Sequence, residues 1–243
     1  MARRGSRGGR GVTGVPDGPE RADRLLLVLA RHGQTPSNVE RLLDTRLPGP
    51  GLTDLGRSQA AALGAELAAA YPHTSAERVV AVYSSVATRA RETAALVADA
   101  LGLLPAVVDG LHEVQVGTLE GRNDDAAVER FRETVDRWRA GDVDLAFEEG
   151  ESAADLVARY RRAIADIRRR HGGGGTVVVV GHGAAIRLAG ADLTSTAGVR
   201  PDDDHLDNCG RITLLEGPRG WTLDSWLADA PGGLRSSFDA TTG

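Results

Sequence analysis

Two short aliphatic runs, each ending next to a histidine, constrain the fold of this chain most strongly. Residues 25–30 read LLLVLA and lead into Arg31, His32 and Gly33, and residues 176–180 read TVVVV and lead into Gly-His-Gly. A continuous apolar run of this length, bounded by glycine, is typical of a strand that is buried on both faces of a parallel sheet. Because ligands bind at the carboxyl ends of such strands, both histidines are expected at one potential site.

The rest of the chain alternates short β-branched segments with longer alanine-rich or arginine-rich segments, which is typical of βαβ units around a mainly parallel sheet. Thr53 and Thr88 are expected to cap helices. Helices are expected over residues 53–71, 89–101, 124–140, 151–171 and 184–193. Further strands are expected at 79–85, within 105–113, and at 211–217 and 221–227, the last two forming a closing hairpin.

Composition favours one soluble globular domain over residues 25–230, since 41% of the residues are hydrophobic and 26% are charged. Residues 1–24 are rich in Arg and Gly and are expected to form a disordered tail, with a nucleic-acid-binding arm as the less favoured alternative. Residues 231–243 are expected to be loose. A single cysteine, no secretory leader and no long apolar run favour a cytoplasmic protein without a membrane span.

The sequence contains partial matches to two common cofactor-binding motifs, and each lacks an essential residue. The strand and turn before Ile186 resemble a dinucleotide-binding fingerprint, but that fingerprint needs Gly or Ala at this position. The segment HEVQV has Val116 where a zinc-binding helix needs its second histidine. We therefore expect neither a metal nor an organic cofactor.

A distributed set of polar residues remains, and all of its members follow predicted strands. They are Arg31, His32, Arg89, Glu113 and His182. Each alone is compatible with an ordinary surface charge or a buried structural histidine. Together they place two arginines, two histidines and one carboxylate at the same end of one sheet, which indicates a functional site.

These residues lie in segments that resemble the histidine phosphatase superfamily, in particular the phosphatase branch of its phosphoglycerate mutase-like family. The matching segments are RHGQT with Asn38, GLTDLGRSQA, YSSVATRARETA, LHEVQVGTLEG, GES and VVVVGHG, in the order and approximate spacing of that family. The resemblance covers nearly all of residues 25–216. It implies a three-layer α/β/α sandwich with the site at the carboxyl ends of the strands.

The resemblance also implies a reaction without a metal. His32 would attack phosphorus and become a phosphohistidine, while Arg31, Arg89 and His182 surround the phosphate. Glu113 would protonate the leaving oxygen and later take a proton from water. Additional phosphate donors are expected among Asn38, Gln34, Thr35 and the amide of Gly183 or Ala184, although helix or loop capping explains these residues equally well.

The segment after the Glu-containing motif bears on the type of reaction. Mutases of this family carry a basic segment there, whereas residues 122–152 end in an acidic loop, which favours hydrolysis of a small phosphorylated metabolite. Arginines 130, 132, 137 and 139 leave a phosphomutase open, and a non-catalytic relative that binds phosphorylated ligands is a third alternative. His112 stands where many relatives carry Arg, so specificity is left open. A homodimer is possible, and nucleic acid is not the expected partner.

Overall fold

The computed structural model describes residues 24–194 and 205–235, which are built around one six-stranded sheet. The strand order is β3-β2-β4-β1-β5-β6; the first four strands run parallel, and β5 and β6 are antiparallel to their neighbours. The strands are β1 (Leu25–Arg31), β2 (Val79–Ser84), β3 (Pro105–Val107), β4 (Gly175–Gly181), β5 (Arg211–Gly217) and β6 (Gly220–Leu227). The predicted mainly parallel sheet and its closing hairpin are confirmed.

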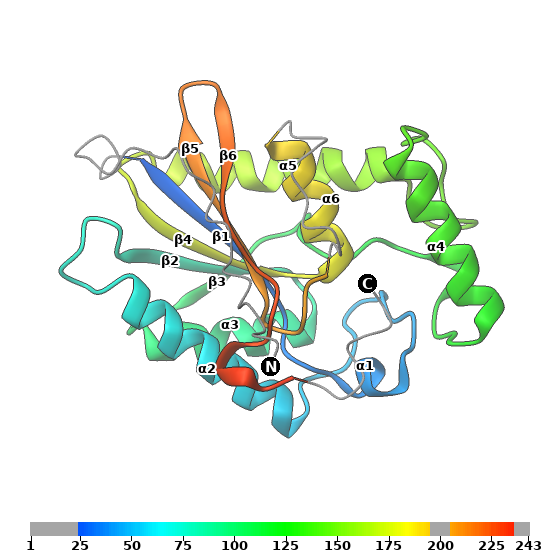
Figure 1. Ribbon diagram of the computed structural model, residues 1–243, viewed down its shortest axis with the longest axis horizontal. Coiled ribbons are helices and arrows are strands. Elements are labelled where there is room, and N and C mark those ends of the chain that lie inside the picture. Colours follow the sequence, from blue (N-terminus) through cyan, green and yellow to red (C-terminus); the bar gives the residue numbers. More distant parts are fainter. Residues whose placement is uncertain (1–23, 195–204, 236–243) are drawn as a thin grey trace, which may run out of the picture.

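Helices cover both faces of the sheet and complete a three-layer α/β/α arrangement (Figure 1). On one face, α2 (Asp54–Ala70) and α3 (Thr88–Ala100) pack against Val28 and Ala30 of β1. On the other face, α5 (Ala153–Arg170) and α6 (Gly183–Leu193) pack against the leucines that alternate with these residues. Because side chains alternate along a strand, a continuous aliphatic run supplies both cores, and β1 is buried on both sides.

Two further helices do not cover the sheet but lie beyond the carboxyl ends of its parallel strands (Figure 1). The five-residue α1 (Pro36–Glu40) follows β1 directly, with Pro36 in its first turn. The longer α4 (Asp125–Arg139) begins at Asp124, whose side chain accepts a hydrogen bond from the Ala127 amide. Sequence patterns predicted α4 but not α1, because one turn and a half is too short to show helical periodicity.

The start of α3 differs from the prediction. Thr88 is the first residue of the helix, and Ala87 occupies the cap position without a side-chain hydrogen bond. The Thr88 amide instead donates to the carbonyl oxygen of Pro48, 2.9 Å away, so a loop distant in sequence satisfies this helix end. By contrast, Thr53 caps α2 as predicted, accepting from the amide of Gly56.

Residues 231–235 do not form a loose tail, contrary to the prediction. Pro231–Gly233 form a short 3₁₀ helix, and Gln59 of α2 donates to the carbonyl oxygen of Leu234 at 2.8 Å. The Gly232 amide donates to Glu66, also on α2. Of the predicted tail over residues 1–24, only Arg24 is described, and its Nε donates to the carbonyl oxygen of Glu216. Residues 1–23 and 236–243 lie outside the described residues. Within the described part of the chain, every helix is too short or too polar to cross a membrane.

Candidate active site

The two histidine-bearing strand ends meet at the centre of the sheet. β1 and β4 are parallel neighbours with Arg31 opposite Gly181, and the His32 amide donates to the Gly181 carbonyl at 3.0 Å. This register brings the rings of His32 and His182 into an edge-to-face arrangement, with centroids 5.2 Å apart and planes at 63°. The two histidines therefore lie next to each other at the carboxyl end of the sheet.

His32 is buried and held in one ring orientation. Its Nδ1 lies 2.8 Å from the carbonyl oxygen of Gly33. Since a carbonyl only accepts, Nδ1 carries the proton, and the neutral ring keeps an unshared electron pair on Nε2. Burial lowers the pKa of His32 well below its ordinary value, and the charges of Arg89 and Arg31 lower it further. The ring is therefore a neutral nitrogen base at physiological pH, as a nucleophile requires.

The backbone of His32 is held by a buried asparagine that sequence patterns did not reveal. Asn208 Nδ2 donates to the His32 carbonyl at 3.0 Å and to Asn38 Oδ1 at 3.1 Å. The Cys209 amide donates to the carbonyl oxygen of Arg31 at 3.1 Å. These bonds join the end of β1 to the residues preceding β5, far away in sequence. Nothing local in the sequence marks Asn208 as part of a site.

Two arginines place their guanidinium groups beside the histidines. Arg31 donates through Nη1 to the Leu206 carbonyl at 2.8 Å. Arg89 is 2% exposed and donates through Nη2 to the Asp44 carbonyl at 3.2 Å, and its Nη1 is 4.0 Å from the Asp44 carboxylate. Nη1 of Arg89 is buried and makes no hydrogen bond within the described residues. Arg89 and His32 both line the pocket, so a ligand bound there lies close to this guanidinium charge.

His182 adds a second buried ring with one nitrogen that has no hydrogen-bond partner among the described residues. Its Nε2 lies 2.7 Å from Ser85 Oγ, whereas Nδ1 is buried and unpaired in the described part of the chain. Burial lowers the pKa of His182 well below its ordinary value, with Arg89 and His32 contributing next. An unsatisfied buried polar atom costs about 1–3 kcal/mol. Arg89 lines the pocket, whereas His182 is fully buried and is not among the residues that line it.

Glu113 lies at the N-terminus of α6. Its carboxylate accepts from the amides of Ala184 at 3.1 Å and Ala185 at 2.9 Å, and from its neighbour Val114 at 2.9 Å. The Ala184 amide, one of two predicted phosphate donors, is thus engaged by Glu113. Gly183 lines the pocket, and a side chain there would press on Arg31, since a Cβ would lie 3.3 Å from its Nε.

The three remaining predicted donors divide into two groups. Thr35 and Asn38 line the pocket and form the capping box of α1: Thr35 Oγ1 accepts from the Asn38 amide at 3.2 Å, and Asn38 Oδ1 accepts from the Thr35 amide at 3.1 Å. With Oδ1 so engaged, Asn38 Nδ2 is the atom suited to face an anion. Gln34 is not among the lining residues, and its amide oxygen accepts from Thr53 Oγ1 at 2.9 Å.

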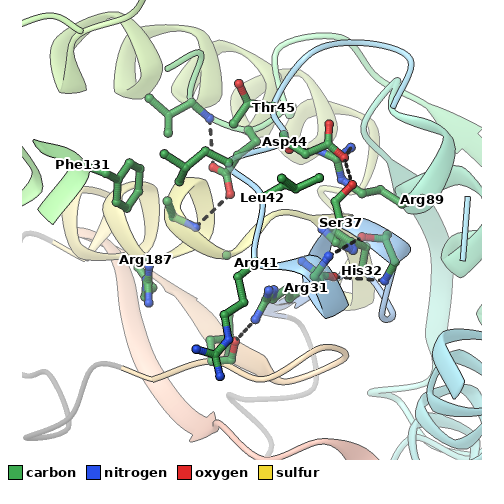
Figure 2. A pocket seen from close by; sticks show the side chains of 18 residues that line it. Arg31, His32, Ser37, Arg41, Leu42, Asp44, Thr45, Arg89, Phe131 and Arg187 are labelled. Carbon is green, nitrogen blue, oxygen red and sulfur yellow. Dashed lines mark hydrogen bonds and ion pairs between the residues drawn. The ribbon is translucent and has the colours of Figure 1, made fainter. Parts of the chain in front are cut away.

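The pocket around these groups has walls that sequence patterns did not predict. Figure 2 shows His32, Ser37 and Arg89 on one side and Phe131 and Arg187 on the other. The unpredicted lining residues are Ser37, Arg41, Leu42, Leu43, Asp44, Thr45, Val114, Phe131, Arg187 and Leu206. Most come from the loop after α1, from α4 and from α6. Among the described residues, no group of three or more His, Cys, Asp or Glu side chains could hold a metal ion.

Burial of neutral histidines makes the stability of the fold depend on pH. The unfolded chain binds a proton on His32 near pH 6.5, whereas the folded chain binds it only at lower pH. Stability is therefore lost progressively as the pH falls from about 6.5 toward the folded-state pKa. We expect His32→Gln to weaken this loss by up to about 1.4 kcal/mol per pH unit. Urea unfolding between about pH 7.5 and about pH 5.5 measures the slope, and equal slopes would contradict the burial argument.

Comparison with known proteins groups this chain with phosphoryl-transfer enzymes. A family model described as the histidine phosphatase superfamily (branch 1) matches residues 27–229. The chain is 38% identical over 167 residues to a 2,3-bisphosphoglycerate-dependent phosphoglycerate mutase of Methylobacterium sp. (strain 4-46), covering 67% of this chain and 77% of that protein. It is 31% identical over 222 residues to the metal-independent phosphoserine phosphatase of Arabidopsis thaliana, covering 88% of this chain and 87% of that protein.

Two further matches differ in extent. A PE-PGRS family protein of Mycobacterium tuberculosis is 42% identical over 96 residues, and the match spans 40% of this chain but 15% of that protein. Among solved structures, a mycobacterial glucosyl-3-phosphoglycerate phosphatase superposes with a TM-score of 0.69 at 27% identity, covering 84% of this chain and 99% of the other. The three-layer fold is thus shared over nearly all of the described residues.

Proposed function

The chain belongs to the histidine phosphatase superfamily (branch 1), and from this premise we propose that it hydrolyses small phosphomonoesters through a phosphohistidine on His32. One observation carries the proposal. The buried, neutral His32 lies edge to face with His182 and lines a pocket together with Arg31, Arg89 and Glu113. A phosphoryl group is the ligand that would use the nucleophile, pair with both arginines and receive a proton from the carboxyl group on its leaving oxygen.

In the first step of the proposed reaction, His32 Nε2 attacks phosphorus in line with the leaving oxygen. The bond between phosphorus and that oxygen breaks as the P–N bond forms, and the oxygen takes a proton from Glu113. In the second step a water attacks phosphorus, and Glu113 takes the proton that the water loses. The P–N bond then breaks, the electron pair returns to Nε2, and inorganic phosphate leaves.

Arginine charges support both steps. Arg31 and Arg89 would pair with the non-bridging oxygens, and an opposite unit charge about 4 Å away is worth roughly 4 kcal/mol at an effective dielectric constant of about 20, before lost hydration is subtracted. The planar guanidinium can donate two parallel hydrogen bonds to phosphate. The same charges lower the pKa of His32, after burial, and so keep it unprotonated.

The positions of the arginines on α4 favour hydrolysis over transfer of the phosphoryl group to another position of the same substrate. Of the four arginines that left a mutase open, three form ion pairs on the surface: Arg130 with Glu133, Arg137 with Asp142 and Arg139 with Asp136. None of the four is among the residues that line the pocket. The pocket of the described residues therefore offers no basic group from α4 to a second phosphate.

Phosphate release in the presence of a chelator tests this proposal. With EDTA added, we expect the rate on an aryl phosphate to change by less than about twofold, because positive charge comes from arginines rather than from a metal. The same assay across sugar phosphates, phosphoglycerates, nucleotides and phosphoamino acids ranks substrates. Loss of activity on chelation would contradict metal independence. Rapid isomerisation of a phosphoglycerate in the presence of its bisphosphate, with little free phosphate, would establish a mutase instead.

A further inference from the structure

The segment that carries Glu113 is held by an arginine from a different element. Residues 110–116 form neither helix nor strand. Arg159, two turns into α5, donates through Nη1 to the carbonyl oxygens of Gly110 at 2.9 Å and His112 at 2.7 Å. It donates through Nη2 to the carbonyl oxygen of Glu113 itself at 3.0 Å. One guanidinium therefore binds three carbonyl oxygens within four consecutive residues.

Glu151 orients this guanidinium and holds the other end of the same segment. Arg159 donates from Nε to Glu151 Oε1 and from Nη2 to Oε2, both at 2.8 Å. Glu151 Oε2 also accepts from the Gln115 amide at 3.0 Å, and the Glu151 amide donates to the Gln115 carbonyl at 2.8 Å. Burial raises the pKa of Glu151, but the hydrogen bonds and charge of Arg159 outweigh it and lower that pKa. The pair is thus ionised and bidentate.

We propose that Arg159 and Glu151 are positioning residues that set the distance between Glu113 and the leaving oxygen. This inference rests on the proposed function, in which Glu113 is the proton donor. Arg159 on α5 holds the backbone carbonyl of Glu113, and the first amides of α6 hold its carboxylate. Glu113 is therefore fixed at its backbone and at its side chain, although residues 110–116 have no regular secondary structure.

A purely structural role would have a different kinetic signature from a positioning role. An alkoxide must be protonated as it leaves, whereas 2,4-dinitrophenolate is weakly basic and leaves without a proton. A displaced Glu113 therefore slows attack on alkyl phosphates and spares the dinitrophenyl ester. The ratio kcat/KM is the appropriate quantity, because it includes only steps up to phosphohistidine formation. General damage to the fold would lower kcat/KM for both substrates equally.

The test compares Arg159→Met with the matched variant Arg161→Met. Arg161 lies on the same helix and pairs with Asp192 at the surface. For Arg159→Met we expect kcat/KM on glycerol 2-phosphate to fall by about 30- to 100-fold, the effect of a misplacement of roughly 1 Å, and kcat/KM on 2,4-dinitrophenyl phosphate to fall by less than about threefold. Arg161→Met should change neither. Equal losses on both substrates, or no loss on the alkyl ester, would overturn the inference.

Milder variants keep the test decisive if Arg159→Met does not fold. Glu151→Gln keeps the shape of the side chain but weakens the ion pair, and Arg159→Lys keeps the charge but loses the planar fork. Both should show the same selective loss on the alkyl ester, to a smaller degree. Glu113→Gln serves as the reference. If it shows no selective loss, the acid role in the proposed function is wrong; if it does and the Arg159 and Glu151 variants do not, only the positioning role is wrong.

Discussion

Replacing His32 with alanine is expected to lower phosphate release by at least about 10⁴-fold, as removal of a nucleophile does in other enzymes that form covalent intermediates. Without the ring, no atom occupies the position of Nε2, which the bond from Nδ1 to Gly33 keeps available for attack. The variant should still bind phosphate, because Arg31, Arg89 and His182 are retained. Steady-state hydrolysis of p-nitrophenyl phosphate measures the loss, and isothermal titration with inorganic phosphate measures binding.

His73→Ala is the matched control, since His73 lies on an exposed turn and is not among the residues that line the pocket. It should keep the full rate. The wild type should also accumulate a phosphoryl group on His32 when quenched during turnover, visible by mass spectrometry of peptides kept at alkaline pH. A His32→Ala enzyme that retains most of its activity, or a phosphoryl group on another residue, would disprove the phosphohistidine mechanism.

Glu113→Gln is expected to separate the two chemical steps. The change keeps the size of the side chain but removes the transferable proton, so kcat/KM on glycerol 2-phosphate should fall by about 10²- to 10⁴-fold. On 2,4-dinitrophenyl phosphate the first step needs no proton, and kcat/KM should be nearly unchanged. The second step still lacks its base, so the phosphohistidine should accumulate. Stopped-flow measurements should therefore show a burst of dinitrophenolate, about one per enzyme molecule, followed by a slow rate.

Glu129→Gln, on the exposed face of α4, provides the comparison and should behave as the wild type does. Equal losses of kcat/KM on both esters without a burst would mean that Glu113 supports the phosphate rather than the leaving group. In that case Glu113 would contribute to activity mainly by holding α6 in place, through its hydrogen bonds with the amides of Ala184 and Ala185.

Much of the fold could be predicted because its signals are local. The aliphatic runs of β1 and β4 are continuous since both faces of these strands are buried, and Thr53 caps α2 through a contact three residues away. Short helices could not be predicted, nor could helix ends whose hydrogen-bond partners lie far away in the sequence. The start of α3 is bound by Pro48, and Pro231–Gly233 are held by α2.

The site divides in the same way. Arg31 is the last residue of β1, and His32 and His182 directly follow β1 and β4, so their location at one edge was predictable from the rule that parallel strands end together. The lowered pKa values of His32 and His182 could not be predicted from strand positions, because burial is their main cause in the structure. The placement of Gln34 beside Thr53, outside the pocket lining, could not be predicted, because a loop residue has no periodicity that shows which way it faces. The cytoplasmic location and the homodimer stay predictions.

The strands, the order of the elements and the two histidines at the same end of one sheet follow from local sequence signals, because burial patterns and helix caps act over a few residues. The surroundings of His32 depend on how distant segments pack. Asn208 binds its carbonyl from 176 residues away, and Arg159 binds the Glu113 carbonyl from 46 residues away. Such hydrogen bonds depend on how α5 and the segment before β5 pack on the sheet. From the sequence, Arg159 on the amphipathic helix α5 is indistinguishable from a solvated surface charge. The carbonyl groups that it binds are known only once the packing of α5 is known.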